Sequence, residues 1–114
     1  MTNGNKLFCW QDPYDLEGTA ELFAAAMEEN ARFQAVRCPD YARILSGQAG
    51  ADLSDPVCLP PIPTLYFKRH ALFSLPEKKL LIKATSSGTS GAMSRMAFDA
   101  GSLLRGLSMV WRMT

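Results

Sequence analysis

The sequence predicts a mixed α/β fold, in which N-terminal helices precede a short strand–loop–strand–helix unit. Three observations predict it: apolar residues recur at helical spacing between residues 19 and 36, an apolar run suited to a strand covers residues 80–85, and an aspartate at position 99 precedes an amphipathic stretch. The 114 residues, 47% of them hydrophobic, suit one domain or part of one, because domains most often contain about 100–150 residues. We divide the chain into a mainly helical region, residues 1–59, and a strand–loop–strand–helix region, residues 60–114.

The N-terminal region predicts one long helix after an irregular arm. The first twelve or so residues show no regular pattern, and we expect Phe8 and Trp10 to dock against an apolar surface. The helix is predicted from Thr19 to Val36, with Glu28 and Arg32 forming a weak i, i+4 pair on its outer face. Its inner face would carry Leu22, Phe23, Ala26, Met27, Asn30, Phe33 and Val36.

A second, shorter helix is predicted over Pro39–Leu45, because proline suits a first turn and Gly47 suits the C′ position. Residues 46–64 are predicted to be mostly loop. Its stretch LPPIPT cannot be a regular helix and forms either a stiff buried connection, which we favour, or a ligand of the SH3 type.

The C-terminal region predicts two strands and a final helix. Leu65–Phe73 forms a short helix or a turn, and Pro76–Lys79 a charged turn. Leu80–Thr85 is predicted as a strand and Met93–Phe98 as a second one. Asp99 would cap a helix over Ala100–Met113, whose two glycines make support by packing necessary. The apolar face of that helix would carry Leu103, Leu104, Leu107, Val110 and Trp111.

Charge and hydropathy exclude several classes of protein. The net charge is +1, but residues 1–30 carry one lysine against six acids, for −5, and residues 66–114 carry eight cations against two acids, for +6. The basic half would favour a local anion, whereas a nucleic-acid partner is not expected, because the cations are spread out. No apolar run approaches the roughly 20 residues of a membrane-spanning helix, and no secretory signal is visible, so we expect a cytoplasmic protein.

The three cysteines, Cys9, Cys38 and Cys58, predict neither a disulfide framework nor a metal site. Their number is odd and they lack CxxC spacing, which favours a reducing compartment. A zinc site built from them and His70 is conceivable, but no pair has ligand spacing. We expect all three to be buried, small apolar residues and predict no metal ligand.

The segment that carries chemistry lies between the two predicted strands. There Thr85 begins a run of seven residues, TSSGTSG, that are all Ser, Thr or Gly. Glycines allow close backbone approach to a ligand, successive N–H groups can converge on an anion, and hydroxyls add donors. The run matches neither a Walker A loop nor GxGxxG nor GxSxG. Composition alone leaves a phosphate-binding loop and a flexible linker equally open.

Ser86-Ser87-Gly88-Thr89-Ser90-Gly91 resembles the [ST]SGT[ST]G signature loop of adenylate-forming enzymes. The wider stretch, about residues 60–105, resembles the acyl-protein synthetase (LuxE-like) family and, less closely, phenylacetate–CoA ligases. The shared features are the Phe67-Lys68 pair, the SSGTSG loop, Ser94 after it and Asp99 before the next helix.

The resemblance implies an N-terminal piece of an ATP-dependent acyl-activating enzyme. Such enzymes join a carboxylic acid, here a long-chain fatty acid, to AMP with release of pyrophosphate, and then pass the acyl group to a thiol of an acceptor protein. The resemblance assigns the ATP phosphates to Ser86, Ser87, Gly88, Thr89, Ser90 and Gly91, with magnesium accompanying the nucleotide. Lys83 and Arg95 flank the loop and would assist, unless they serve only as surface charges.

Two departures from the family limit this expectation. Ala92-Met93-Ser94-Arg95 replaces the Lys-Pro-Lys stretch of many relatives, which suits the LuxE-like branch better. The later motifs for adenine, ribose and metal, the catalytic lysine and the acyl-accepting cysteine have no counterpart, so we expect no catalysis by this chain alone. Two alternatives remain: a non-catalytic interaction module that associates with itself or a partner, and a small α/β domain with an inert loop.

Overall fold

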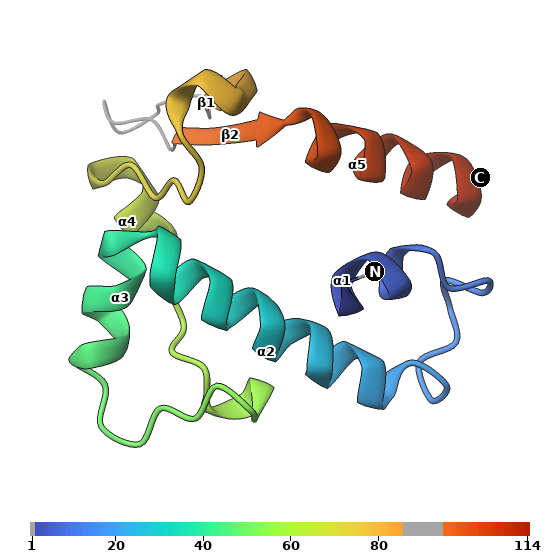
Figure 1. Ribbon diagram of the computed structural model, residues 1–114, viewed down its shortest axis with the longest axis horizontal. Helices are drawn as coiled ribbons and strands as arrows, with labels where there is room; N and C mark the ends of the chain where they lie inside the picture. Colours follow the sequence, from blue (N-terminus) through green and yellow to red (C-terminus); the bar gives the residue numbers. More distant parts are fainter. Residues whose placement is uncertain (1, 86–94) are drawn as a thin grey trace.

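A computed structural model describes residues 2–85 and 95–114 and has the mixed α/β fold that the sequence predicts. Helices occupy the N-terminal region, and a two-stranded antiparallel hairpin and a C-terminal helix follow (Figure 1). The longer elements are α1 (Asn3–Phe8), α2 (Ala20–Arg37), α3 (Pro39–Ser46), α4 (Thr64–Arg69), β1 (Leu80–Thr85), β2 (Arg95–Asp99) and α5 (Ala100–Met113).

The N-terminal arm is not irregular, because residues 3–8 form α1. Thr2 accepts a hydrogen bond from the Asn5 amide, and Glu29 of α2 accepts hydrogen bonds from the amides of Asn3 and Gly4 at 3.1 and 3.4 Å. A carboxylate at this end satisfies donors that a helix leaves unpaired and complements the helix dipole. The missed helix therefore depends on a side chain more than twenty positions away.

A turn organised by Asp15 leads into α2. Its carboxylate accepts hydrogen bonds from the Trp10 indole at 3.2 Å and from the Gly18 amide at 2.9 Å. The helix then runs within one residue of its predicted bounds. The predicted pair on its outer face is present, with Arg32 Nη2 2.7 Å from Glu28 Oε1.

The segment between α2 and the hairpin contains more helix than predicted. Helix α3 extends to Ser46, so Gly47 is its C-cap residue, with an ordinary φ of −84°, and not the residue after the cap. Asp55 accepts a hydrogen bond from the Val57 amide and starts a 3₁₀ turn, η1 (Pro56–Cys58), inside the predicted loop. Helix α4 ends at Arg69, four residues earlier than the predicted limit, and a second 3₁₀ turn, η2 (Glu77–Lys79), forms the predicted charged turn.

Strand β1 has the predicted bounds, and β2 begins at Arg95 in the described part of the chain. The strands pair in antiparallel register from Leu80 opposite Asp99 to Thr85 opposite Arg95, with an irregularity between Leu80 and Ile82. Helix α5 follows directly and has the predicted bounds, and its Asp99 cap accepts a hydrogen bond from the Ser102 amide at 2.8 Å. Asp99 therefore serves both as the last strand residue and as the cap.

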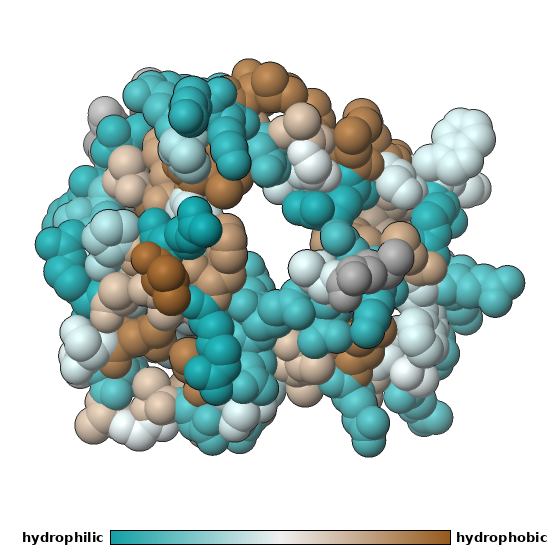
Figure 2. All heavy atoms as spheres, in the orientation of Figure 1, coloured by the Kyte–Doolittle hydropathy of each residue, from teal (hydrophilic) through white to brown (hydrophobic). Residues whose placement is uncertain are grey.

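The described residues bury little of their apolar surface. Few apolar residues of the described part are buried: Ala26, Ala31 and Cys38, in or next to α2, and Pro60. The elements follow one another around a ring, from α1 along α2 and α4 to the hairpin and back through α5 to α1 (Figure 1). The space-filling view shows an opening through the middle of this ring (Figure 2). The predicted inner face of the long helix is therefore partly exposed, with Phe23, Phe33 and Val36 at 47%, 42% and 81%.

Candidate functional site

The hairpin holds the two ends of the predicted phosphate-binding segment. Strand β1 ends at Thr85, directly before that segment, and β2 begins at Arg95 after it. The predicted residues Ser86, Ser87, Gly88, Thr89, Ser90 and Gly91 lie outside the described residues, as do Met93 and Ser94. The described site therefore consists of the strand ends and the charged side chains around them.

Lys83 and Arg95 project from the same face of the hairpin. Arg95 lies opposite Thr85, and Lys83 lies two positions before Thr85. Side chains two apart in a strand share a face, and so do directly opposed residues of an antiparallel pair. The pairing thus brings together, at the end of the hairpin that borders the SSGTSG segment, two cations that are twelve positions apart in the chain.

One of these cations already has a counter-ion. The Lys83 ammonium forms an exposed ion pair with Glu77 of η2. The hydrogen bond from Lys83 holds the pKa of the Glu77 carboxyl below its usual value of 4.5. In contrast, the Arg95 guanidinium has no hydrogen-bond or ion-pair partner among residues 2–85 and 95–114. Arg95 can therefore bind an anion without breaking another contact in the described part of the chain. Lys83 would first have to break its ion pair with Glu77.

The two cations also border a cavity of about 360 Å³, whose other walls include Phe73, Thr85 and Met96. Its lining is mainly apolar apart from the charged groups at its edge. A partly apolar wall lowers the local dielectric constant and strengthens attraction between a cation and a phosphate. Glu77, the counter-ion of Lys83, also lines this cavity, so an anion bound there would compete with its carboxylate.

No protein-family model, curated protein or solved structure gives a significant match to this chain. The resemblance to acyl-protein synthetases therefore depends on the residues quoted above, from Phe67-Lys68 to Asp99.

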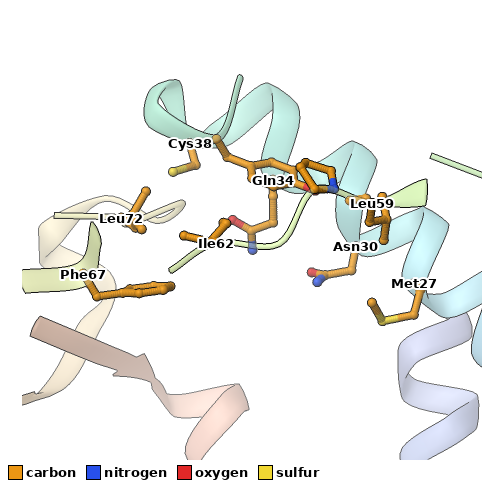
Figure 3. Close-up of a pocket in the computed structure, with 11 residues that line it drawn as sticks. Met27, Asn30, Gln34, Cys38, Leu59, Ile62, Phe67 and Leu72 are labelled. Atoms are coloured by element: carbon orange, nitrogen blue, oxygen red, sulfur yellow. The ribbon is translucent and has the colours of Figure 1, made fainter. Parts of the chain in front are cut away.

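A second cavity, of about 490 Å³, lies between α2, α3 and the segment from Leu59 to Leu72 (Figure 3). Ile62, Phe67 and Leu72 face it from one side, and the amides of Asn30 and Gln34 point into it from α2 (Figure 3). Neither amide side chain forms a hydrogen bond within the described part of the chain. No Asp, Glu, Lys, Arg or His side chain lines this cavity.

Sequence reasoning did not find this second cavity. Proline-rich residues 59–63 were expected to make a stiff connection, and Leu59, Pro60 and Ile62 do form one wall of the cavity. The partner wall comes from α2, whose inner face was expected to be covered. The feature of the sequence that pointed to this cavity was Asn30, the one polar residue on the predicted inner face.

The cysteines differ from the prediction. Cys38 is buried, but Cys9 and Cys58 are exposed. Cys9 is the C-cap residue of α1 and Cys58 is the last residue of η1, and both lie at the surface. The neighbouring Asp55 raises the pKa of the Cys58 thiol, which disfavours the nucleophilic thiolate.

Among residues 2–85 and 95–114, no three His, Cys, Asp or Glu side chains gather closely enough to hold a metal ion. No helix in that part of the chain has the length and hydropathy needed to cross a membrane.

Proposed function

We propose that this chain supplies the phosphate-binding segment of an ATP-dependent acyl-activating enzyme of the acyl-protein synthetase type. The observation that carries the proposal is the position of SSGTSG between two paired antiparallel strands. A linker of the same composition would not need paired strands at its two ends. The proposal places the enzyme in the cytoplasm, with ATP, a long-chain fatty acid and an acceptor protein as partners.

The reaction has two steps. A carboxylate oxygen of the fatty acid attacks the α-phosphorus of ATP, the bond to the β-phosphate oxygen breaks, and acyl-AMP and pyrophosphate result. A protein thiol, as thiolate, then attacks the acyl carbonyl carbon, and AMP leaves. In the first step, negative charge moves onto pyrophosphate, and donors fixed around the β- and γ-phosphates stabilise that charge.

We assign a role in phosphate binding to each residue of the site. The hydroxyls of Ser86, Ser87, Thr89 and Ser90 would donate to phosphate oxygens, and Gly88 and Gly91 would allow close backbone approach. Arg95, which has no partner in the described part of the chain, would contact the phosphates directly. Lys83 would contribute after leaving Glu77.

The described residues contain no cluster of ligands for magnesium. Magnesium would therefore arrive with the nucleotide, held by its phosphate oxygens and by water. When bound, magnesium neutralises phosphate charge. We assign no groups of this chain to adenine, ribose or the acyl chain, so we expect phosphate binding without turnover.

The experiment is a calorimetric titration of the full chain with pyrophosphate and, separately, with ATP and magnesium. We expect weak, saturable binding of both, because the shared polyphosphate group carries the interaction. Thr89→Ala should weaken binding about tenfold or more, the effect of one hydrogen bond to a charged group. Ser108→Ala removes a hydroxyl from the exposed surface of α5 and is the matched control.

Two results would contradict the proposal: no saturable binding of either ligand, or equal weakening by Thr89→Ala and Ser108→Ala. An ATP–pyrophosphate exchange assay tests the expectation that the chain binds phosphate without turnover. The isolated chain should give no exchange, and robust exchange would show that it carries a complete active site.

A further inference from the structure

Helix α5 turns its arginines toward the rest of the chain and its large apolar side chains away from it. Arg105 lies over the ring of Phe8, 5.7 Å from its centroid, and Arg112 donates a hydrogen bond to the Phe8 carbonyl oxygen. These arginines are seven positions apart and so share one face of the helix. The other side carries what we name the outer apolar face: Leu104, Leu107, Val110 and Trp111, which are 61–83% exposed.

The exposure of this face reverses the usual arrangement of an amphipathic helix, which buries its apolar stripe. Figure 2 shows hydrophobic atoms along the upper edge of the molecule, over the hairpin and the first part of α5. A contiguous exposed apolar patch on a protein marks an interaction site. Because two glycines weaken α5 on its own, a partner on this face would also supply the packing that the helix lacks.

The chain exposes more surface than a compact monomer of the same mass. The chain exposes 8264 Å². A compact monomer of 12.5 kDa would expose about 6,200 Å². The radius of gyration, 15.6 Å, likewise exceeds the roughly 13 Å expected for 114 residues. The surplus of about 2,000 Å² is spread over the whole ring, the central opening included, and it leaves room for the roughly 800 Å² that each partner buries in a stable interface.

The chemistry of the face suits a second copy of the same chain. None of its four residues is charged, and the arginines of α5 are held on the opposite side, so two such faces meet without like-charge repulsion. Leu107 and Val110 of this face continue the alternating three- and four-residue spacing that starts at Ala100 and at the half-buried Leu103, the spacing of a helix-pairing seam. An uncharged seam is self-complementary, as an interface across a two-fold axis requires.

We propose that the outer apolar face of α5 is the interface of a homodimer in which two α5 helices pack against each other. Leu107 lies at the centre of the seam, and Leu104 and Trp111 flank it. The proposal does not depend on phosphate binding, because Lys83 and Arg95 belong to the hairpin and not to this face.

Sedimentation equilibrium of the full chain at several concentrations tests the proposal. We expect a mass of twice 12.5 kDa, with dissociation on dilution. Leu107→Lys and Trp111→Lys should each raise the dissociation constant about 30-fold or more, the effect of losing a central interface side chain. The matched control is Val57→Lys, because Val57 is 91% exposed on η1, and this variant should remain dimeric.

The fluorescence of Trp111 gives a local measurement. The chain has two tryptophans, so a Trp10→Phe variant reports Trp111 alone. Its emission should shift to the blue as concentration rises through the dissociation constant, because pairing removes water from the indole. Circular dichroism of the lysine variants should match that of the original chain at the same monomer fraction.

A chain that stays monomeric at every accessible concentration overturns the proposal, even if it binds another polypeptide through α5. A dimer that survives both lysine variants, or that Val57→Lys dissociates equally, also overturns it. Pyrophosphate titrations of the same variants are read separately, so loss of the dimer and loss of phosphate binding are distinguishable.

Discussion

Arg112 donates a hydrogen bond from its guanidinium to the backbone carbonyl oxygen of Phe8, which precedes it by 104 positions. Arg105, which lies about two turns earlier on α5, donates a hydrogen bond to the side chain of Asn5 at 3.5 Å. These contacts connect the first helix to the last one. They involve polar groups at or near the surface, so they hold the two helices together with little apolar burial.

Removing the arginine contacts should release α1 from α5. We expect Arg112→Gln to lower the free energy of unfolding by about 1 kcal/mol, the net value of an ordinary hydrogen bond. Hydrogen exchange should accelerate at the amides of α1 while those of α3 keep their rates. Arg69→Gln is the control, since the Arg69 guanidinium has no partner within the described residues, and an equal effect there would contradict the assignment.

Gly18 should not tolerate a side chain. A Cβ at this position would overlap with the Asp15 carboxylate, so Gly18→Ala must displace the group that accepts hydrogen bonds from the Trp10 indole and the Gly18 amide. We expect destabilisation of about 1–2 kcal/mol, from two weakened hydrogen bonds, with a change in Trp10 fluorescence. Urea denaturation measures the loss.

Gly4→Ala is the matched control for Gly18→Ala. No atom lies within 4 Å of a Cβ built there, and the residue lies in α1. Alanine favours helix over glycine, so we expect stabilisation of up to about 1 kcal/mol. A Gly4→Ala variant that loses as much stability as Gly18→Ala would argue against the role of the Asp15 turn.

The cap of α5 should make stability depend on acid. The hydrogen bonds from Ser102 hold the pKa of the Asp99 carboxyl below its ordinary value of 3.8. Because the charged form is favoured in the folded state, the contribution is fully present above the unfolded pKa. It is lost as pH falls through the lowered folded pKa.

Urea midpoints at neutral pH and below pH 3 test this cap. Asp99→Asn keeps a capping side chain but removes the titration, so its midpoint should vary less with pH. Asp99→Ala should lose helix content in α5 at all pH values. A pH dependence unchanged in Asp99→Asn would contradict the prediction.

Glu77 should compete with phosphate for Lys83. Glu77→Gln removes the counter-ion of Lys83, so pyrophosphate binding should strengthen about two- to fivefold, the factor typical of an exposed ion pair. Calorimetry at low ionic strength measures the change. Glu21→Gln, at the start of α2, removes the same charge far from the hairpin. It should leave the affinity almost unchanged, because salt screens the interaction between distant surface charges.

Local patterns in the sequence predict the parts of the fold that local physics determines. The bounds of α2, β1 and α5 agree with prediction to within one residue, because periodicity, turn residues and the Asp99 cap act within a few positions. Helix α1 was missed because the carboxylate that supports it belongs to Glu29, on another helix. Long-range capping leaves no local pattern.

The sequence also predicts which residues form the apolar face of α5, but it does not predict that this face is exposed. Periodicity shows which residues share a face, whereas burial depends on what lies opposite. Trp111 was expected to pack and is 83% exposed. Of the candidate site, the strands and the two cations were predicted, but their common face depends on the register of the hairpin, which follows from pairing and not from composition.

The closure of the ring by α1 and α5 has a consequence for how the molecule folds. Bringing together chain segments about 100 residues apart costs roughly 4 kcal/mol of loop entropy when the intervening chain is disordered, more than a few surface contacts return. The contact between α1 and α5 therefore forms only after α2 and the hairpin have shortened the path between them. Because few contacts support it, we expect it to be the first contact to open in the native state.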